Sequence, residues 1–435
     1  QRKVSGMKTI NIGLLGFGTI GAGVVSGIQN HGDLIASRTG IRLVIKKIAD
    51  IDLETDRGVK VSRSVLTTDA KAVVADPRID VIIELIGGTR IARELTLQAL
   101  NAGKPVVTAN KALLSEYGSE IFGLAEKKNT DIYFEGSVGG CIPIIRAVRE
   151  ALVADRFESV YGILNGTCNY ILTRMEQDGL PFEKVLAEAQ AKGYAEANPG
   201  LDVDGIDTAH KAVVLAGLMS GVVVPMEAAY IEGIRRITDE DIRAAKDLGY
   251  RVKLLAWIRI DGAAMEIRVH PTLVPLDNLL ASVNGVFNAI MVKTAMAGCT
   301  MYYGRGAGRE PTASAVLGDV VDVARNLVAG TPRRVRGVSA RGARMRFKSM
   351  NDAVTACYLR IPAVGPGAAA TIKAALQKHT VAVTSAAWRK ARGGRGGSIV
   401  ILTRPCVEKR MNAALQALSR LKAVRGEPVR IRLAE

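Results

Sequence analysis

The sequence predicts an α/β protein. We expect a Rossmann-like parallel sheet in a nucleotide domain, an α+β substrate and dimerisation domain, and a C-terminal ferredoxin-like βαββαβ domain. Three observations lead to this prediction: a glycine-rich turn after the first apolar strand, alternation of strands and helices up to residue 134, and a second pattern of short strands and helices from residue 356. A chain of 435 residues is too long for one hydrophobic core, so we expect two or three domains.

The first strand and the turn after it predict a dinucleotide-binding site. Residues 9–15 are apolar, and Gly-Phe-Gly-Thr-Ile-Gly follows directly before a helix pattern. In this motif the first glycine permits a tight turn, the second lets the backbone approach a pyrophosphate, and the third lets helix and strand pack closely. The alternative is a glycine-rich turn without a ligand. The residues expected to bind the cofactor here are Gly16, Phe17, Gly18, Thr19, Ile20 and Gly21.

The second strand, at 41–49, ends in an acidic residue that bears on the choice of cofactor. Asp50 is placed to accept hydrogen bonds from an adenosine ribose and to repel a 2′-phosphate, which favours NAD. Residues 30–40 are interpreted as an inserted loop, and the nearby Lys60 and Arg63 leave NADP open. The alternative role for Asp50 is that of a turn residue at a strand end.

The strand and helix alternation continues and brings polar residues to the ends of parallel strands. The elements expected are strands at 80–86, 104–109 and 131–134 and helices at 91–102 and 115–128. In such sheets ligands bind outside the carboxyl ends of the strands. The residues at these ends, which we also expect to contact the cofactor, are Gly87, Gly88, Thr108, Asn110 and Lys111. Lys111 is also open to a solvent-exposed role in the first turn of a helix.

After residue 134 the pattern changes to that of an α+β region. The elements expected are a glycine-rich turn at 135–140, helices at 143–153, 170–178 and 181–192, and strands at 158–164, 251–260, 264–270 and 283–291. A second glycine-rich loop at 298–308 precedes a helix at 311–327, which we expect to return to the nucleotide domain. Gly306 in this loop is a further residue expected to let the backbone approach the cofactor.

One segment combines acidic residues with a lysine beside an apolar helix. Asp207 and Lys211 are four residues apart and therefore point the same way on a helix, which continues into the apolar residues 212–219. A lysine that enters a buried helix has to be paired or functional, because an unpaired buried charge is costly. The alternative is a surface ion pair of little consequence.

The last quarter of the chain carries the positive charge of the protein. Residues 331–435 contain 22 lysines and arginines against 4 acidic residues, and the formal net charge of the whole chain is +17. We expect a linker at 331–349, strands at 357–361, 381–388, 398–403 and 428–433, helices at 368–378 and 407–421, and an arginine- and glycine-rich loop at 392–397. Few aromatic residues accompany the arginines, so a solvated surface is favoured over nucleic-acid binding.

The remaining composition limits other classes. The five cysteines are widely spaced without a CxxC pair and the four histidines are scattered, so we expect neither a disulfide framework nor a zinc site. His210 is interpreted as a packing residue. No apolar run has the length of a membrane span, and no signal peptide is recognised. The cysteine pattern makes a reducing cytoplasm the expected location. Residues 1–6 are interpreted either as an extension before Met7 or as residues left over from cloning.

Together these motifs resemble homoserine dehydrogenases of the long form with a C-terminal ACT domain, over nearly the whole chain from Met7. The matching motifs are Gly16–Gly21, Thr108–Lys111, Phe134–Pro143, Leu164–Thr173, Gly193–Pro199 with Asp202 to Lys211, and Gly306–Thr312. The resemblance implies a dinucleotide-binding domain at 7–140 and 303–330, a substrate and dimerisation domain at 141–302, a linker at 331–349 and an ACT-like domain at 350–435.

The resemblance also implies an activity. It is the NAD(P)-dependent interconversion of L-homoserine and L-aspartate 4-semialdehyde, in the biosynthesis of threonine and methionine. The residues it implies for catalysis are Lys211, Lys111 and Asp207. Those implied for substrate binding are Glu196, Asp202, Asp207, Gly166, Thr167, Gly193 and Tyr194. Backbone carbonyls implied for a monovalent cation, sodium, are those of Glu135, Val138, Gly140 and Ile142.

Further implications are a homodimer or homotetramer and a threonine effector. Two departures from the family pattern bear on them. Asn198 stands where an aspartate is frequent, and the turn Val364-Gly-Pro-Gly lacks the acid that usually starts the effector loop. The alternatives are a catalytically idle amino-acid sensor that uses the ACT-like domain, and another amino-acid NAD(P) oxidoreductase.

Overall fold

The structure, a computed structural model, describes residues 7–339, 345–390 and 396–434. Residues 1–6 and most of the arginine- and glycine-rich loop predicted at 392–397 lie outside these ranges. The chain forms two compact units. The first consists of the described residues within 1–157, 210–226 and 290–345, and the second of those within 158–209, 227–289 and 346–435.

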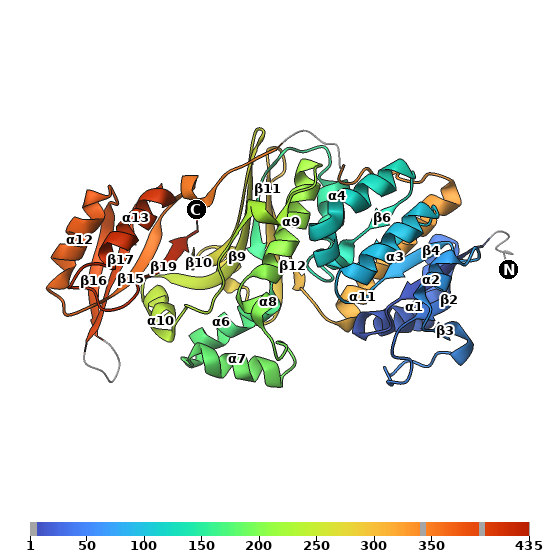
Figure 1. The fold of residues 1–435 in the computed structure, drawn as a ribbon, viewed down its shortest axis with the longest axis horizontal. Helices are drawn as coiled ribbons and strands as arrows, with labels where there is room; N and C mark the ends of the chain where they lie inside the picture. Colours follow the sequence, from blue (N-terminus) through green and yellow to red (C-terminus); the bar gives the residue numbers. More distant parts are fainter. Residues whose placement is uncertain (1–6, 340–344, 391–395, 435) are drawn as a thin grey trace. The chain divides into compact units, whose positions relative to one another are not determined.

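A six-stranded sheet in the order β3-β2-β1-β4-β5-β6 forms the centre of the first unit (Figure 1). All of its strand pairs are parallel, which confirms the predicted Rossmann-like sheet. Its elements are β1 (Lys8–Leu15), α1 (Thr19–Thr39), β2 (Ile41–Ala49), η1 (Arg63–Val65), β3 (Leu66–Thr67), α2 (Ala70–Ala75), β4 (Val81–Glu84), α3 (Arg90–Asn101), β5 (Val106–Thr108), α4 (Lys111–Lys127) and β6 (Ile132–Tyr133). Further elements are η2 (Glu135–Ser137), α5 (Ile144–Arg146), η3 (Ala147–Ala151), the later part of α9 (Ile206–Ser220), most of β11 (Phe287–Thr294), β12 (Gly298–Arg305) and α11 (Arg309–Ala329).

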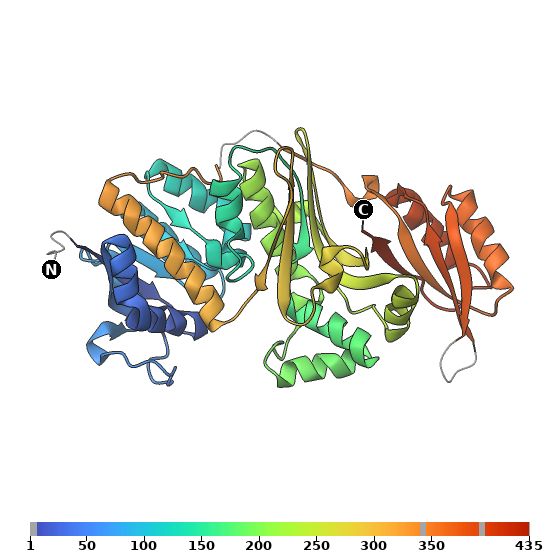
Figure 2. The same ribbon diagram turned by 180° about the vertical axis from the view of Figure 1, so that it is seen from behind.

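Helices cover both faces of this sheet. Helices α1 and α11 pack on one face, where Ile12 and Leu14 of β1 join a core with Val24 and Val320. Figure 2 shows these two helices, in dark blue and orange, over the same face. Helices α2, α3 and α4 pack on the other face, around Leu15 and its neighbours. Because both faces are covered, the central strands β4 and β5 are buried along their whole length.

Two predictions about loops are wrong. Residues 30–39 continue helix α1 and do not form an inserted loop, and the helix ends at Gly40, whose φ is +72°. The polar residues that suggested a loop lie largely on the solvent side of this helix. Residues 298–305 form strand β12, which is next to β11 in its sheet. The run Thr-Met-Tyr-Tyr has the residue types that favour a strand, and only 306–308 form a loop.

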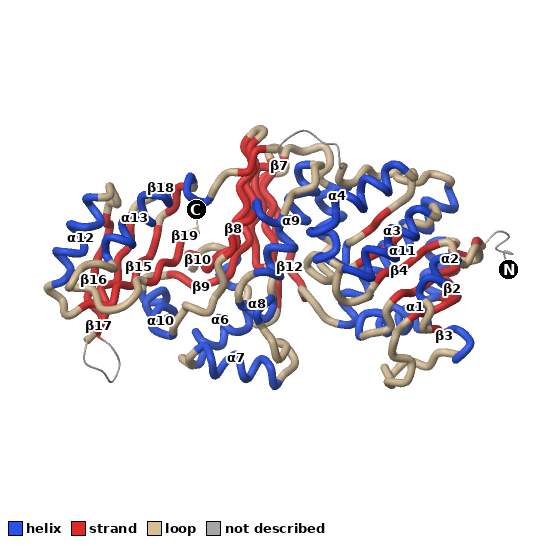
Figure 3. The backbone as a smooth tube through the Cα atoms, viewed as in Figure 1, coloured by secondary structure: helices blue, strands red, loops and turns tan. Residues whose placement is uncertain are grey.

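The second unit is built on a mixed sheet. Within it the strands, drawn in red in Figure 3, follow the order β7-β9-β10-β19-β15-β17-β16. Strands β8 and β13 also pair with β10. Its elements are β7 (Phe157–Ile163), α6 (Gly166–Asp178), α7 (Phe182–Ala191), α8 (Gly200–Val203), the start of α9 (Ile206–Ser220), η4 (Met226–Ala228), β8 (Ala229–Ile231), α10 (Asp239–Asp247), β9 (Tyr250–Asp261), β10 (Ala264–Pro275) and η5 (Leu279–Ser282). The remainder are β13 (Arg346–Phe347), η6 (Met350–Asp352), β14 (Val354–Thr355), β15 (Cys357–Ala363), α12 (Ala368–Lys378), β16 (Val383–Lys390), β17 (Gly397–Thr403), β18 (Cys406–Val407), α13 (Glu408–Leu418) and β19 (Val429–Leu433).

The C-terminal part of this unit has the predicted ferredoxin-like order. Strands β19-β15-β17-β16 form an antiparallel sheet, and α12 and α13 pack together around Ile372, Leu376 and Met411. Within the described ranges, no helix combines the length and the hydrophobicity that a membrane span requires.

Candidate active site

The glycine-rich turn has the geometry of a phosphate cradle. Gly16 has φ +94°, and a Cβ atom there would lie 2.5 Å from the carbonyl oxygen of Leu85. A Cβ atom on Gly21 would lie 2.1 Å from the carbonyl oxygen of Gly16, whereas one on Gly18 would meet nothing within 4 Å. The turn is therefore closed where strand and helix pack and open where helix α1 begins, which fits a pyrophosphate at the helix N-terminus.

Asp50 folds back onto this turn. Its Oδ2 accepts a hydrogen bond from Phe17 N at 2.5 Å, and its Oδ1 accepts one from Asp52 N at 2.9 Å. Arg57 lies 3.8 Å from Asp50 Oδ1 and 3.2 Å from Asp52 Oδ2, and its guanidinium stands 5.3 Å from the centre of the Phe17 ring. Sequence reasoning did not single out Arg57, because only the folded loop brings it to Asp50.

The ends of β4 and β5 meet through a buried carboxyl group. Thr108 Oγ1 donates to Glu84 Oε2 at 2.6 Å, and Ile86 N donates to Glu84 Oε1 at 2.7 Å. Burial raises the pKa of Glu84 to about 7, although both hydrogen bonds act to lower it. Glu84 was missed as a site residue. The available signal was an acidic residue at the end of the apolar run 81–83.

Asn110 links the neighbouring loops at this edge. Its Oδ1 caps helix α4 by accepting from Leu113 N at 3.0 Å, and its Nδ2 donates to the carbonyl oxygen of Gly88 at 2.8 Å. Open space adjoins both Gly87 and Gly88, and Lys111 is the first residue of α4. The structure therefore gathers the predicted strand-end residues along the same edge as the glycine-rich turn.

The turn at 135–142 packs against the loop that carries Gly306. Gly140 has φ +58°, and a Cβ atom there would lie 2.7 Å from both Arg305 O and the carbonyl carbon of Gly306. The carbonyl oxygen of Glu135 accepts a hydrogen bond from Val138 N at 3.4 Å, and that of Ile142 accepts one from Ile144 N at 2.7 Å. Each keeps a second lone pair. Among the described residues no group of three or more His, Cys, Asp or Glu is suited to a metal, so a cation at this turn would depend on carbonyls such as those of Glu135, Val138, Gly140 and Ile142.

The side chain of Glu135 belongs to a buried acidic network. Its carboxylate accepts from Ile145 N at 2.9 Å and Arg146 N at 2.8 Å, and its backbone N donates to Asp319 Oδ2 at 2.7 Å. Burial, with the nearby Glu135 as a second cause, raises the pKa of Asp319 to about 8. Asp319 and the side chain of Glu135 were not predicted. Their role here is to hold the turn against α11.

Two predicted substrate carboxylates come together in the second unit. Asn165 Nδ2 donates to Asp202 Oδ1 at 2.7 Å and to Asp207 Oδ2 at 2.9 Å. Asn165 Oδ1 accepts from Cys168 N at 2.8 Å and so caps helix α6. One amide therefore fixes both acids from the end of β7. Asn165 belongs to the motif Leu164–Thr173, but it was not predicted as a site residue.

Asp207 and Lys211 lie on the same helix, as predicted. Asp207 stands in the first turn of α9 and Lys211 follows four residues later. Each is only 8% exposed, among alanines and valines that are buried as well. The alternative of a solvent-exposed ion pair therefore does not apply to Lys211.

The loops that carry the remaining substrate residues also meet. Thr167 Oγ1 donates to the carbonyl oxygen of Tyr194 at 2.6 Å, and the Tyr170 and Tyr194 rings make an edge contact at 5.0 Å. Gly193 has φ +71°. A Cβ atom on Gly166 would lie 2.7 Å from the carbonyl oxygen of Val286.

Glu196 differs from the other predicted acids. It is exposed, and it lies outside the hydrogen-bonded set of Asn165, Asp202 and Asp207. Its backbone carbonyl oxygen accepts from Gln190 Nε2 at 3.0 Å. The carboxylate of Glu196 is thus available at the surface of the turn.

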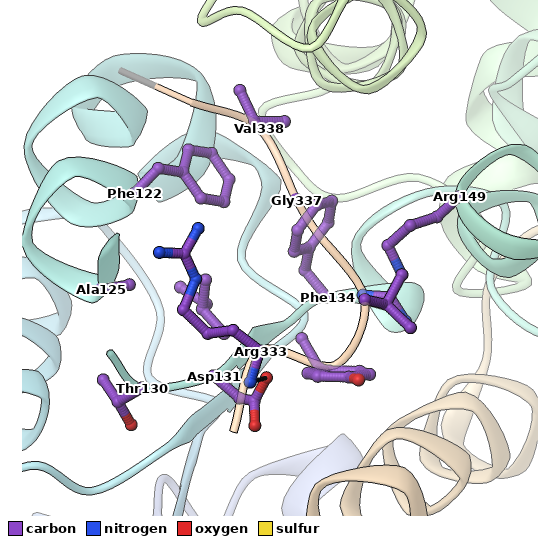
Figure 4. A pocket seen from close by; sticks show the side chains of 12 residues that line it. Phe122, Ala125, Thr130, Asp131, Phe134, Arg149, Arg333, Gly337 and Val338 are labelled. Carbon is purple, nitrogen blue, oxygen red and sulfur yellow. Dashed lines mark hydrogen bonds between the residues drawn. The ribbon is translucent and has the colours of Figure 1, made fainter. Parts of the chain in front are cut away.

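A small cavity in the first unit is lined by none of the predicted site residues. Its volume is about 30 Å³, and Figure 4 shows Arg333 pointing into it beneath Phe122, with Arg149 on the opposite side. The Arg149 guanidinium stands 4.1 Å from the centre of the Tyr133 ring. A cavity of this size has room for water but not for a nucleotide or an amino acid.

Comparisons with known proteins bear directly on this site. Family models described as "Homoserine dehydrogenase, NAD binding domain" and "Homoserine dehydrogenase" match residues 16–135 and 143–321. The chain is similar to the homoserine dehydrogenase of Neisseria gonorrhoeae, with 42% identity over 98% of this chain and 99% of that protein. A crystal structure of a homoserine dehydrogenase from Thiobacillus denitrificans matches with a TM-score of 0.93 and 43% identity, covering 99% of each chain.

A more distant structure concerns the cofactor. It is a hyperthermophilic archaeal homoserine dehydrogenase mutant in complex with NADPH, with a TM-score of 0.63 and 27% identity over 73% of this chain and 98% of that one. These comparisons do not favour an idle amino-acid sensor or another amino-acid oxidoreductase.

Proposed function

Because the chain belongs to the homoserine dehydrogenase family and is an oxidoreductase with an NAD-binding domain, we propose that it interconverts L-homoserine and L-aspartate 4-semialdehyde. The observation that carries this proposal is that Asn165 holds the carboxylates of Asp202 and Asp207, and that Asp207 stands in the first turn of the helix that also bears the buried Lys211. We assign cofactor binding to 7–140 with 303–330, substrate binding and dimerisation to 141–302, a linking role to 331–349 and an ACT-like regulatory role to 350–435.

The acids recognise the amino end of the substrate. Homoserine carries an ammonium group, and Asp202 and Asp207 offer it two oriented carboxylates. Charge-assisted hydrogen bonds of this kind are about twice as strong as neutral ones. The exposed Glu196, with the loops of Gly166, Thr167, Gly193 and Tyr194, completes the substrate-binding set that we propose.

Lys211 handles the proton. In reduction its ammonium stabilises the negative charge that develops on the aldehyde oxygen and donates a proton to it. In oxidation the neutral amine accepts the hydroxyl proton. Asp207, one helical turn earlier, orients this side chain. Lys111, at the start of α4, is the second cationic group that we assign to catalysis.

The nicotinamide cofactor, when bound, supplies or accepts the hydride. The residues that hold it are those of the open glycine turn with Asp50, and the strand-end residues Gly87, Gly88, Thr108, Asn110 and Lys111 together with Gly306. Both oxygens of Asp50 accept backbone hydrogen bonds while Arg57 adds a positive charge beside it. The acid favours NAD and the arginine favours NADP, so the family-level assignment is NAD or NADP.

Three finer proposals accompany this function. They are sodium at the carbonyls of the 135–142 turn, threonine as an effector of the ACT-like domain, and a homodimer or homotetramer. The tight packing of Gly140 on Gly306 supports a cation role, since a rigid turn holds its carbonyls in place. The ferredoxin-like strand order supports the ACT-like assignment.

The test is a spectrophotometric assay of L-homoserine oxidation with NAD or NADP, repeated with added threonine and with sodium or potassium. Lys211→Met should reduce turnover by at least about 100-fold, the contribution typical of a positioned proton donor, while nucleotide binding persists. The matched control is Lys104→Met, which removes another buried lysine, one that donates to the carbonyl oxygen of Asp76. Equal turnover of the two variants, or a wild type inactive on homoserine, would contradict the proposal.

A further inference from the structure

The last strand of the chain, β19, lies between β10 and β15 in the mixed sheet. Residues Arg432 and Leu433 of β19 pair in parallel with Thr272 and Leu273 of β10, and β19 also pairs antiparallel with β15. The C-terminal ferredoxin-like part therefore shares a strand with the sheet of the substrate region. A side chain on β19 can therefore contact both the substrate region and the C-terminal part.

Arg432 is the most deeply buried arginine on this strand, with 1% exposure. Its Nε and Nη2 donate to the two carboxylate oxygens of Glu408 at 2.8 and 3.1 Å. Its Nη1 donates to Glu232 Oε2 at 2.7 Å. A buried cation that serves two carboxylates cannot be removed without leaving charge behind.

The contacts of Arg432 fix strand β8. Tyr230 Oη donates to Glu232 Oε2 at 2.9 Å and accepts from Arg432 Nη2 at 3.3 Å. The guanidinium also stands 5.0 Å from the centre of the Tyr230 ring. The tyrosine and the glutamate on β8 and just after it are thus oriented by one residue of β19.

The segment after β8 lies directly on the turn that carries the substrate acids. Ile234 N donates to the carbonyl oxygen of Val203 at 2.8 Å. A Cβ atom on Gly233 would lie 2.2 Å from Val203 O and 2.4 Å from Asp204 Cα, so backbone packs on backbone. Arg235 also donates to both carboxylate oxygens of Asp204. Contact this close means that a shift of segment 230–235 moves the turn at 202–207.

We propose that Arg432 is a positioning residue for Asp202 and Asp207, acting from the C-terminal domain through Glu232, Tyr230 and segment 233–235. This inference rests on the proposed role of the two acids in binding the substrate ammonium. Arg432 does not touch the substrate. It sets where the acids stand, and the affinity for homoserine depends on the C-terminal strand as a result.

The consequence is selective. Without Arg432, Glu408 keeps the hydrogen bond from Arg430, whereas Glu232 loses its cation and can turn to water. Segment 230–235 then loses the side-chain anchor beside β19. The glycine turn of the nucleotide site contains none of these residues, so the affinity for the cofactor should not change.

Arg432→Met should raise KM for homoserine by about tenfold or more, the factor that corresponds to about 1.4 kcal/mol. The KM for the cofactor should stay within about twofold, because no cofactor residue lies in the path. Arg432→Lys, which keeps a cation, should recover part of the affinity. Glu232→Gln should raise KM for homoserine in the same direction and is the milder change, since Glu232 lies nearer the surface.

The matched control is Arg430→Met. Arg430 lies on the same strand and donates to the same Glu408, but its other hydrogen-bond acceptor is Asn412 of α13 and not a residue of β8. Thermal unfolding of every variant separates lost stability from lost positioning. If Arg430→Met and Arg432→Met raise KM for homoserine equally, or if Arg432→Met and Glu232→Gln both leave it unchanged in an active enzyme, the inference is wrong. A wild type inactive on homoserine would instead count against the proposed function.

Discussion

The ionisation of single residues near the nucleotide turn is opposed by burial. Glu84 has no exposed surface, and burial raises the pKa of its carboxyl group to about 7 from an ordinary value of 4.5. Its folded pKa is thus higher than its unfolded pKa. The contribution of protonated Glu84 to the free energy of unfolding is therefore fully present below pH 4.5 and is lost as the pH rises through about 7.

Glu84→Gln should remove this dependence. At pH 8 the variant should be more stable than the wild type, by on the order of 3 kcal/mol if the whole pKa shift is realised, and below pH 5 the advantage should vanish. Urea unfolding of both proteins at pH 5 and pH 8 measures the difference. Asp319, whose pKa burial raises to about 8, is common to both proteins and cancels.

The control for this experiment is Glu120→Gln. Glu120 pairs with Arg93 at the surface, with 43% of its side chain exposed. Surface pairs contribute little, so its stability difference should stay within about 1 kcal/mol at both pH values. Parallel pH curves for the wild type and Glu84→Gln would contradict the assignment of the shift to Glu84.

At this scale the sequence predicted the residues whose neighbours are close in the chain. The glycine turn and the Asp207 to Lys211 spacing were predicted because a motif or one helical turn defines them. Asn165 was not predicted, because its partners Asp202 and Asp207 are 37 and 42 residues away in the chain. Arg57 was not predicted either, because it reaches Asp50 only through the folding of a loop. Such contacts depend on how the sheet brings strand ends together, which local periodicity does not record.

In the turn between β1 and α1, different glycines serve helix–strand packing and ligand binding. Gly21 is closed, since a Cβ atom there would lie 2.1 Å from a backbone oxygen, and Gly18 is open to a distance of 4 Å. One glycine therefore serves the contact between helix and strand, and the other leaves space for a ligand. The same motif contains both roles, and substitution can separate them.

Gly18→Ala should weaken nucleotide binding by about tenfold or more while the melting temperature stays unchanged, because the added methyl group occupies the ligand's space alone. Gly21→Ala should lower the melting temperature, since α1 or β1 has to move. Fluorescence titration with NADH and NADPH and thermal unfolding are the two measurements. Gly32→Ala, in open space within the same helix, is the control and should not weaken binding. A Gly18→Ala variant that binds like the wild type would contradict the cradle.

The elements themselves show where sequence reasoning succeeds. The parallel sheet and the βαββαβ order were predicted because each strand is apolar and bounded by turn residues. Residues 30–39 were taken for a loop because polar residues and Gly32 hide a helix whose outer side faces water. Strand β12 was taken for a loop because glycines stand at both of its ends. In both cases tertiary contacts outweigh local composition.

At the scale of the whole molecule, buried charge joins the C-terminal part to the rest of the second unit. Asp241, in the first turn of α10, is fully buried and accepts from Arg360 Nε at 2.7 Å and Nη2 at 3.0 Å. Tyr358 Oη donates to the same carboxylate at 3.1 Å, and Thr238 completes its cap. β15 carries both Tyr358 and Arg360, so this carboxylate ties the C-terminal part to α10. The pairing of β19 with β10 is a second link between the C-terminal part and the rest of the unit.

Arg360→Met should lower the free energy of unfolding by about 3–5 kcal/mol, because it leaves the charge of Asp241 buried without a cation. Adding Asp241→Asn should restore part of the loss, so that the two substitutions are coupled by more than about 0.5 kcal/mol in a double-mutant cycle. Arg236→Met is the control: Arg236 pairs with Glu427 and so also connects the substrate region to the C-terminal part, but both side chains are exposed. Denaturant unfolding should show almost no change for it. Two separate transitions in Arg360→Met would mean that the shared strand alone does not couple the unfolding of the two parts. An additive cycle would mean that Asp241 does not depend on Arg360.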